Sequence, residues 1–198
     1  MGRSPVNARA TSQLRIIGGQ WRGRKLVFAP APGLRPTPDR VRETLFNWLA
    51  PFVHGARCVD LFAGSGALGL EALSRGAAYC DFVDASERAA RQIEAHLAML
   101  GAAEQGRCHA IPALQFLQRA ESGYDIAFID PPFDSDLLAP ACALLARRQL
   151  LNEGALVYTE TAAAERPPLV PPGWNLHREK RAGGVGFRLF IVADGQIV

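Results

Sequence analysis

The chain has 198 residues, of which 48% are hydrophobic, and a formal net charge of +3. This length and composition allow one domain with a sizeable buried core, and no run approaches the roughly 20 apolar residues that a membrane span needs. The amino terminus, MGRSPVNARATSQ, lacks the apolar core of a secretory signal, so we expect a cytoplasmic protein.

The positive charge is concentrated at the amino-terminal end. Residues 1–42 contain nine Arg or Lys residues and one acid, a net charge of +8, whereas residues 43–198 contain 13 bases and 18 acids, a net charge of −5. A basic segment on an acidic body predicts that the segment contacts a polyanion. A basic tail that is merely solvated is the alternative.

The four cysteines and four histidines lie singly along the chain. Three of the cysteines lie in or beside apolar runs, and no pair of cysteines or histidines has the spacing of metal ligands. We therefore expect reduced, structural thiols and no metal site.

The amino-terminal part predicts a hairpin, a linker and a helix, in that order. Residues 14–28 have the pattern of two short strands around a Gly-rich basic turn, and residues 29–36 that of a Pro/Gly linker. Thr37 is the expected helix cap, with Pro38 in the first helical position, and apolar residues recur at helical spacing as far as Ala50.

From residue 56 onward, apolar strand-like runs alternate with helical stretches. The predicted strands are residues 57–62, 79–83, 107–111, 124–129 and 154–159, and the predicted helices are residues 67–75, 87–100, 113–121 and 135–147. Such alternation indicates βαβ units and a parallel sheet covered on both faces. Two last strands, joined across Gly183 and Gly184, add an antiparallel hairpin at one edge, which gives a seven-stranded mixed sheet. Its ligand should bind outside the carboxyl ends of the central strands.

A glycine loop follows the first of these strands. Gly64, Gly66 and Gly69 match the pattern G-x-G-x-x-G between a strand and a helix, which is typical of nucleotide-type cofactors. Asp60 stands four residues before the loop, where its carboxylate would repel a pyrophosphate but would accept hydrogen bonds from an ammonium group. Asp84 ends the second strand, where a carboxylate suits a ribose diol. These residues favour S-adenosylmethionine over a nicotinamide dinucleotide; glycines that serve only strand–helix packing are a third interpretation.

The remaining cofactor contacts are expected from Phe62, before the glycine loop, and from Ala113, after the third strand. The side chain that would bind the adenine is not evident, because Pro112 occupies its usual place. Backbone groups near Ala113, or the side chains of Asp81 or His109, are the candidates for this contact.

The fourth strand ends in the tetrapeptide Asp-Pro-Pro-Phe. Prolines block further sheet pairing, so Asp130 should stand at the carboxyl edge of the strand, and a simple strand terminator is one interpretation. In an open sheet, however, this strand lies beside the first and faces the cofactor. The Asp130 carboxylate and the Pro131 carbonyl would then accept both N–H protons of a flat exocyclic amine and free its lone pair for attack on a sulfonium methyl. Phe133 would stack on the base.

These motifs resemble those of a known family. The stretches DPPF (residues 130–133) and DLFAGSGALG (residues 60–69) resemble class I methyltransferases that act on amino groups conjugated to a π system. Three further segments, RIIGGQWRGRKL, RPTPDRVRETLFNWL and LHREKRAGGVGFRLF, narrow the resemblance to the RsmD family, bacterial enzymes that methylate N2 of one guanine in small-subunit ribosomal RNA. The resemblance covers the chain from Arg15 to about Ile191.

The resemblance implies a Rossmann-like class I methyltransferase fold with S-adenosylmethionine as cofactor. It implies the small ribosomal subunit as partner, with guanine 966 of 16S rRNA as target. It also implies target-base contacts from Asp130, Pro131 and Phe133. On this basis we divide the chain into a basic extension with a β-hairpin, residues 1–36, and a methyltransferase domain, residues 37–198, and we expect a monomer.

RNA contacts are implied for the basic amino-terminal part of the chain. The expected residues are Arg15, Trp21, Arg22, Arg24, Lys25, Arg35 and Arg40. Arginine and lysine would position the phosphates, which gives affinity and a steep salt dependence. Trp21 has two interpretations, since its indole could stack on an unpaired nucleotide or fold the hairpin onto the domain.

Other functions fit parts of the sequence. A methyltransferase for adenine N6 or cytosine N4, in DNA or another RNA, would use the same tetrapeptide, whereas enzymes that act on glutamine amides generally have Asn at position 130. An NAD-dependent oxidoreductase would keep the glycine loop but would leave Asp60, the Asp-Pro-Pro-Phe edge and the basic segment without a role. A non-catalytic ribosome-assembly factor could retain the fold.

Overall fold

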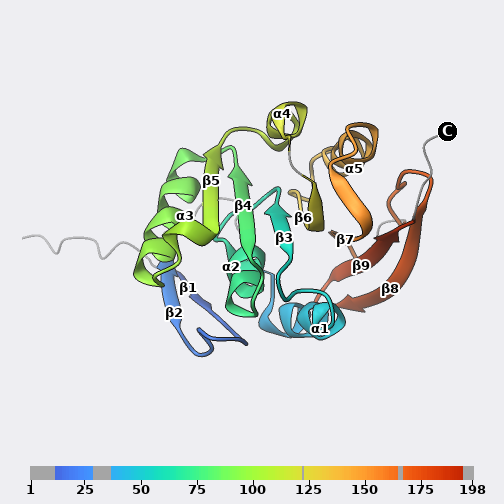
Figure 1. Cartoon of the computed structure of the whole chain (residues 1–198). Coiled ribbons are helices and arrows are strands. Elements are labelled where there is room, and N and C mark those ends of the chain that lie inside the picture. Colours follow the sequence, from blue (N-terminus) through green and yellow to red (C-terminus); the bar gives the residue numbers. More distant parts are fainter. Residues whose placement is uncertain (1–11, 29–36, 122, 165–166, 194–198) are drawn as a thin grey trace, which may run out of the picture.

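The computed structural model describes residues 12–28, 37–121, 123–164 and 167–193. It contains a seven-stranded sheet, a separate two-stranded hairpin and helices on both sides of the sheet (Figure 1). The strands are β1 (Ser12–Arg15), β2 (Lys25–Phe28), β3 (Arg57–Asp60), β4 (Tyr79–Asp84), β5 (Gly106–Ala110), β6 (Tyr124–Ile129), β7 (Leu151–Ala162), β8 (Trp174–Ala182) and β9 (Val185–Val192). The helices are α1 (Asp39–Leu49), α2 (Ala67–Ser74), α3 (Glu87–Met99), α4 (Ala113–Arg119) and α5 (Leu138–Arg147), with a 3-10 turn η1 (Ala103–Gln105).

The large sheet has the strand order β5-β4-β3-β6-β7-β9-β8. The first five strands are parallel, and β9 runs antiparallel to both β7 and β8. The predicted seven-stranded mixed sheet is therefore confirmed, and β6 lies beside β3 as expected. Between these two strands the chain reverses its direction of travel across the sheet, which is where open sheets bind ligands.

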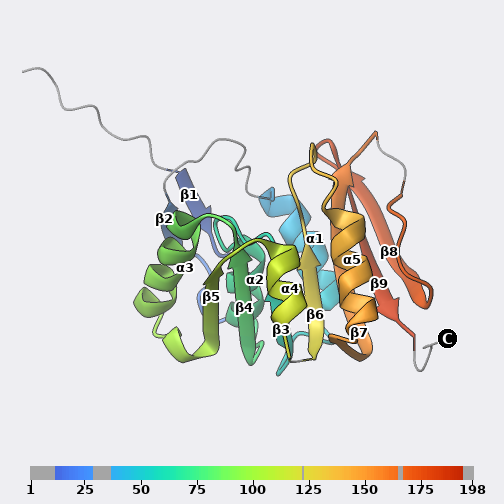
Figure 2. The same ribbon diagram turned by 90° about the horizontal axis from the view of Figure 1, so that it is seen from above.

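Helices cover both faces of the sheet. Helices α1, α2 and α3 pack on one face and helices α4 and α5 on the other, and Figures 1 and 2 show the two sides. Successive residues of β6 alternate between the two cores: Phe128 packs with the first group of helices, and Ala127 and Ile129 pack with the second. Because both faces are covered, the central strands read as continuous apolar runs. No helix in the described ranges is long and apolar enough to cross a bilayer.

The ends of several elements differ from the prediction. Strand β3 ends at Asp60 rather than at residue 62, because the chain turns there toward the glycine loop. Helix α5 begins at Leu138, three residues later than expected. Strand β7 is longer than expected, because Leu151 pairs with β6 at one end and Ala162 pairs with β9 at the other.

The β1–β2 hairpin packs onto the main domain. Its buried side chains belong to the same core cluster as helices α1 and α2: Leu14, Ile16, Trp21, Leu26 and Phe28. Gly19 has a φ of 75°, and a Cβ there would lie 1.8 Å from the Ser74 carbonyl oxygen. Only glycine allows the turn to approach helix α2 this closely.

A buried carboxylate fixes this contact. Glu71 on α2 is fully buried and accepts hydrogen bonds from the backbone N–H groups of Ile17 (2.9 Å) and Gly18 (2.7 Å). Arg75 Nε donates to the same carboxylate at 2.8 Å, and Arg42 lies at 3.6 Å. The segment RIIGGQW therefore contains residues that are needed for this contact. Arg42, one of the nine bases of the amino-terminal part, is a buried structural residue.

Candidate active site

Three carboxylates stand at the carboxyl ends of adjacent strands. Asp60 is the last residue of β3, Asp130 directly follows β6, and Glu160 lies near the end of β7. The strand register pairs Asp60 with Phe128 and Ile129 with Thr159. Because paired residues of parallel strands share a face and successive residues alternate, all three side chains point to the face that carries α1 and α2.

These three carboxylates lack counter-ions. Within residues 12–28, 37–121, 123–164 and 167–193, no Lys, Arg or His forms an ion pair with any of them. Asp60 is 3% exposed, and burial raises the pKa of its carboxyl to about 7. Its Oδ2 accepts the Gly69 N–H at 3.1 Å. A buried carboxylate without a cation fits the ammonium group of an amino-acid-bearing cofactor.

The glycine loop is held from both sides by aspartates. Asp84, half-buried at the end of β4, accepts the Gly64 N–H on Oδ2 (2.9 Å) and the Ser86 N–H on Oδ1 (2.8 Å). Gly64 and Gly66 have φ values of 52° and 79°, which favour glycine. The carboxylate oxygens of Asp84 keep lone pairs for further donors, so a ribose diol remains a suitable ligand there.

Gly69 has a packing role. A Cβ at this position would lie 2.3 Å from the Phe82 ring and 2.8 Å from Cys80 Sγ, so α2 can lie on β4 only without a side chain there. The third glycine of the motif therefore serves strand–helix packing, which was one of the interpretations left open by the sequence. Gly64 and Gly66, in the turn itself, stay predicted cofactor contacts.

Asp130 is held by Thr37 rather than by a cation. The Thr37 Oγ1 hydroxyl lies 3.5 Å from Asp130 Oδ2. Burial, followed by the negative charges of Glu160 and Asp60, raises the pKa of the Asp130 carboxyl well above its usual value. The predicted helix cap at Thr37 is wrong: Pro38 occupies the N-cap position of α1 without a side-chain cap, because the threonine hydroxyl faces the carboxylates.

The rest of the tetrapeptide has the form that the sequence predicted. Pro131 is buried, and the Pro132 carbonyl accepts both the backbone N–H (2.9 Å) and the hydroxyl (2.6 Å) of Ser135, which closes a turn. Phe133 is 47% exposed at this edge. An exposed aromatic beside a carboxylate and a proline carbonyl can stack on a flat ring.

Glu160 is a site residue that the sequence reasoning missed. It is 3% exposed, and its Oε1 accepts the Tyr158 hydroxyl at 2.6 Å. The signal that could have found it is the same one that found Asp84 and Asp130, an acid at the end of an apolar strand. In the stretch GALVYTETA, the acid follows a polar threonine, which hides the pattern.

Asp81 and His109, two candidates for the adenine contact, lie beside one another. Asp81 lies three residues before the end of β4 and accepts the Tyr124 hydroxyl (2.9 Å), while His109 Nε2 lies 2.7 Å from its other oxygen. His109 is one residue before the end of β5, near the carboxyl edge of the sheet, so an adenine contact from either side chain stays a prediction. Ala113, the first residue of α4, and Phe62, half-buried beside the glycine loop, stay predicted contacts.

Comparisons with known proteins identify the family of this chain. The chain matches the family model described as conserved hypothetical protein 95 over residues 14–191. It is 49% identical to ribosomal RNA small subunit methyltransferase D of Escherichia coli (strain K12) over 184 residues, 93% of this chain and 92% of that protein. The chain belongs to the RsmD family.

A second relative and a solved structure extend the likeness. The chain is 43% identical to ribosomal RNA small subunit methyltransferase D of Haemophilus influenzae, covering 91% of this chain and 95% of that protein. A solved structure described as putative methyltransferase yhhF from Escherichia coli has a TM-score of 0.85 at 47% identity and covers 93% of this chain and all of that one. The predicted methyltransferase fold is thereby confirmed.

The basic residues expected at the RNA lie mostly on the surface of this RsmD family member. Arg22, Arg24, Lys25 and Arg40 are exposed. Arg15 is exposed too, but its guanidinium pairs with Asp39 at 3.0 Å. Arg35 lies outside the described residues. Their contact with RNA stays a prediction.

The position of Trp21 favours hairpin docking over nucleotide stacking, the two interpretations that the sequence left open. Its side chain is 7% exposed and lies in the core cluster shared by the hairpin and the main domain. Its backbone N–H donates to Ser74 Oγ at 3.0 Å. The indole therefore fixes the hairpin on the domain, and in this conformation it is not available to stack on a nucleotide.

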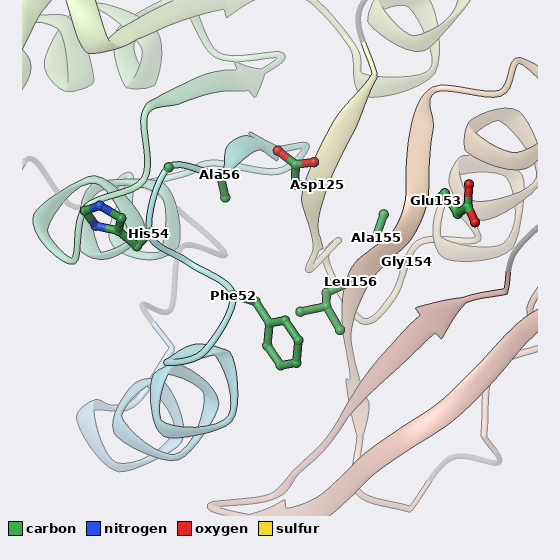
Figure 3. Close-up of a pocket in the computed structure, with 9 residues that line it drawn as sticks. Phe52, His54, Ala56, Asp125, Glu153, Gly154, Ala155 and Leu156 are labelled. Atoms are coloured by element: carbon green, nitrogen blue, oxygen red, sulfur yellow. The ribbon is translucent and has the colours of Figure 1, made fainter.

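A hollow on the opposite edge of the sheet is separate from these carboxylates. Figure 3 shows Phe52, His54, Asp125 and Glu153 among its lining residues, at the amino ends of β3, β6 and β7. Asp125 is occupied there, since it accepts the Arg57 N–H (2.8 Å) and the Asn152 side chain (2.7 Å). Ligands of open parallel sheets bind at the carboxyl edge, so this hollow is not the cofactor site.

Proposed function

We propose that this chain transfers a methyl group from S-adenosylmethionine to the exocyclic N2 of guanine 966 in 16S rRNA of the small ribosomal subunit. The observation that carries the proposal is the position of Asp130. It ends the strand directly beside β3, whose own end bears Asp60 and the glycine loop. Family membership supports rRNA as the substrate, since the relatives are named as small-subunit rRNA methyltransferases.

The cofactor would be held by the residues around the glycine loop. Asp60 would accept hydrogen bonds from its ammonium group and Asp84 from its ribose hydroxyls. Phe62, Gly64, Gly66 and Ala113 would line the rest of the site. This arrangement is supported by the missing counter-ion of Asp60 and by the positive φ values of the two glycines.

The chemistry depends on how the target amine is held. The cofactor, when bound, would supply a methyl group on a sulfonium that the amine nitrogen can attack, and the sulfur would keep the electron pair of the C–S bond. The Asp130 carboxylate and the Pro131 carbonyl would accept the two N–H protons and draw the nitrogen toward tetrahedral geometry. Phe133 would stack on the guanine, and Asp130 would take the proton that the nitrogen loses.

The RNA would be bound mainly through its phosphates. The charges that position the substrate would come from six basic residues: Arg15, Arg22, Arg24, Lys25, Arg35 and Arg40. The guanine would have to leave its stack to enter the carboxyl edge. Helix α2 connects the two regions, because it begins at the glycine loop and carries the hairpin on Glu71 and Ser74.

The test is methyl transfer from labelled S-adenosylmethionine to small ribosomal subunits that lack this modification, followed by digestion to nucleosides. The expected product is N2-methylguanosine at one position. Label in N6-methyladenosine or N4-methylcytidine would support the related amino-methyltransferases instead. Binding of NADH without binding of S-adenosylmethionine would overturn the proposal altogether.

A further inference from the structure

Glu160 is a buried carboxyl for which the proposed reaction has no role. Thr159 pairs in register with Ile129, so the next residues, Glu160 and Asp130, lie side by side on one face of the sheet. The charge of Glu160 acts directly on Asp130. Two neighbouring buried carboxyls rarely ionise together, so at neutral pH this pair holds one proton.

The two carboxyls differ in the donors that stabilise a negative charge. Glu160 accepts the Tyr158 hydroxyl at 2.6 Å and a hydrogen bond from the Thr37 hydroxyl. The Thr37 hydroxyl has a single proton to donate; it also lies 3.5 Å from Asp130 Oδ2, and no other described side chain donates a hydrogen bond to Asp130. Since hydrogen bonds to the charged form favour ionisation, the negative charge belongs on Glu160 and the proton on Asp130.

The other groups around Asp130 do not reverse this preference. The titratable and charged groups that act on it from the neighbouring strands are acidic or neutral: Asp60, Tyr158 and Glu160. Helix α1 contributes Arg42, whose Nε donates to the Thr37 carbonyl, but the rest of its guanidinium faces Asp39 and Glu71. The nearby arginine therefore orients the threonine without neutralising the carboxyl pair.

We propose that Glu160 is a positioning residue that keeps the negative charge of this pair, so that Asp130 carries a proton until positive charge enters the site. Thr37 is the bridge for the exchange. Asp130 gives its proton to the Thr37 hydroxyl oxygen while the hydroxyl passes its own proton to Glu160, and the number of protons is unchanged. A cationic group beside Asp130 drives the exchange, because it stabilises negative charge at the nearer carboxyl.

The exchange gives the buried site a balanced charge throughout the reaction. Before transfer, one negative charge on the pair faces one positive charge on the methyl donor. Afterwards the donor is neutral, and the proton lost by the amine nitrogen has added to Asp130, so the pair is neutral too. In the empty site, the proton on Asp130 avoids two adjacent buried negative charges. The role of Asp130 as acceptor rests on the proposed function, whereas its protonation in the empty site does not.

Infrared spectroscopy of the cofactor-free protein tests the resting state. The spectra are recorded about one pH unit above the pKa of Asp60, which is about 7, so that Asp60 is mostly ionised. We expect a carboxylic-acid C=O band that is lost in Asp130→Asn, because Glu160 alone ionises, and lost in Glu160→Gln, because Asp130 alone ionises. Glu153→Gln is the matched control, an exposed glutamate at the opposite end of β7, and keeps the band. A wild-type protein without the band, or a Glu160→Gln variant that keeps it, would overturn the inference.

The pH profile of single-turnover methyl transfer tests the consequence. In wild type, the negative charge is already present on Glu160 and reaches Asp130 by the exchange, whereas in Glu160→Gln Asp130 must lose its own proton, so the acid limb of the profile moves to higher pH by roughly one unit or more. Tyr158→Phe removes a donor from Glu160 and shifts the limb in the same direction by less, which keeps the inference testable if the first variant folds poorly. An unmoved acid limb in both variants contradicts it. A protein that shows the infrared pattern but transfers no methyl group to guanine would refute the proposed function and leave the carboxyl pair standing.

Discussion

Two groups of buried carboxylates in this molecule have opposite surroundings. Glu71 on α2 meets two backbone N–H groups and the guanidinium of Arg75, with Arg42 close by. Asp60, Asp130 and Glu160 have no ion-pair partner in the described part of the chain. The first carboxylate holds the hairpin on the domain, and the second group forms a negative site that a cationic ligand can complete. The supply of counter-charge, more than burial, distinguishes the structural acid from the acids of the candidate site.

The largest effect on folding is expected from Glu71→Ala. This change leaves Arg42 and Arg75 without their buried partner and removes two acceptors of backbone N–H groups, so we expect a loss of about 3–5 kcal/mol in the free energy of unfolding. Urea unfolding measures it, and hydrogen exchange should quicken at Ile17 and Gly18.

The matched control for this prediction is Glu87→Ala. Glu87 and Arg91 on α3 have the same i,i+4 spacing as Glu71 and Arg75, but both side chains are largely exposed. Surface pairs of this kind contribute about 0.3–0.5 kcal/mol. Equal losses in the two variants would show that the hairpin does not depend on the buried carboxylate.

The largest effect on activity is expected from Asp130→Ala. Loss of an acceptor that orients the amine should lower the rate of methyl transfer by about 100-fold to 1,000-fold. Binding of S-adenosylmethionine, measured by calorimetry, should change little, because the cofactor contacts are expected from Asp60 and Asp84. A parallel loss of binding and transfer would indicate that Asp130 is a structural residue.

Asp60→Asn should stabilise the cofactor-free protein at alkaline pH. The pKa of this carboxyl is raised to about 7 in the folded state from an ordinary value of 3.8, so the folded protein loses stability as the pH rises through this interval. A neutral amide avoids that loss, on the order of 4 kcal/mol at pH values above 7. Denaturant unfolding should give a clear difference at about pH 8 and almost none at about pH 4.

The Asp60→Asn variant should also lose affinity for S-adenosylmethionine, because a neutral amide cannot balance the charge of the cofactor's ammonium group. A variant that gains stability against unfolding but loses affinity for S-adenosylmethionine would indicate that the acid binds the ligand and does not stabilise the fold. A variant that is less stable than wild type at both pH values would place Asp60 with Glu71, among the structural acids.

The smallest effect is expected from the exposed bases of the hairpin. Replacing Arg22, Arg24 and Lys25 by alanine should weaken RNA binding and flatten its salt dependence by about 2 in the slope of log affinity against log salt. The unfolding free energy should stay within about 0.5 kcal/mol of wild type, because these side chains are exposed. Filter binding over a range of salt concentrations measures the slope, and an unchanged slope would remove the hairpin from the RNA interface.

Most of the fold and half of the site followed from local patterns in the sequence. The strand and helix alternation predicted the sheet. Asp84 and Asp130 were found because each stands at the end of an apolar strand, and Asp60 because it stands four residues before the glycine loop. Glu160 was missed because two threonines flank it, and Thr37 was assigned to a helix cap because its contact with Asp130 spans 93 positions of the chain. Such a contact leaves no local periodicity to detect.

The sequence by itself determined the order of strands and helices and which part of the chain is basic, because both are properties of consecutive residues. The tertiary structure decided which side chains those residues contact. The register of β6 and β7 sets Glu160 beside Asp130. Trp21 and Arg42 belong to the basic part of the sequence, but both side chains are buried in the folded protein. The physical reason is that the charge state of a carboxyl and the exposure of an arginine or tryptophan depend on neighbours that are distant in the chain and close in space.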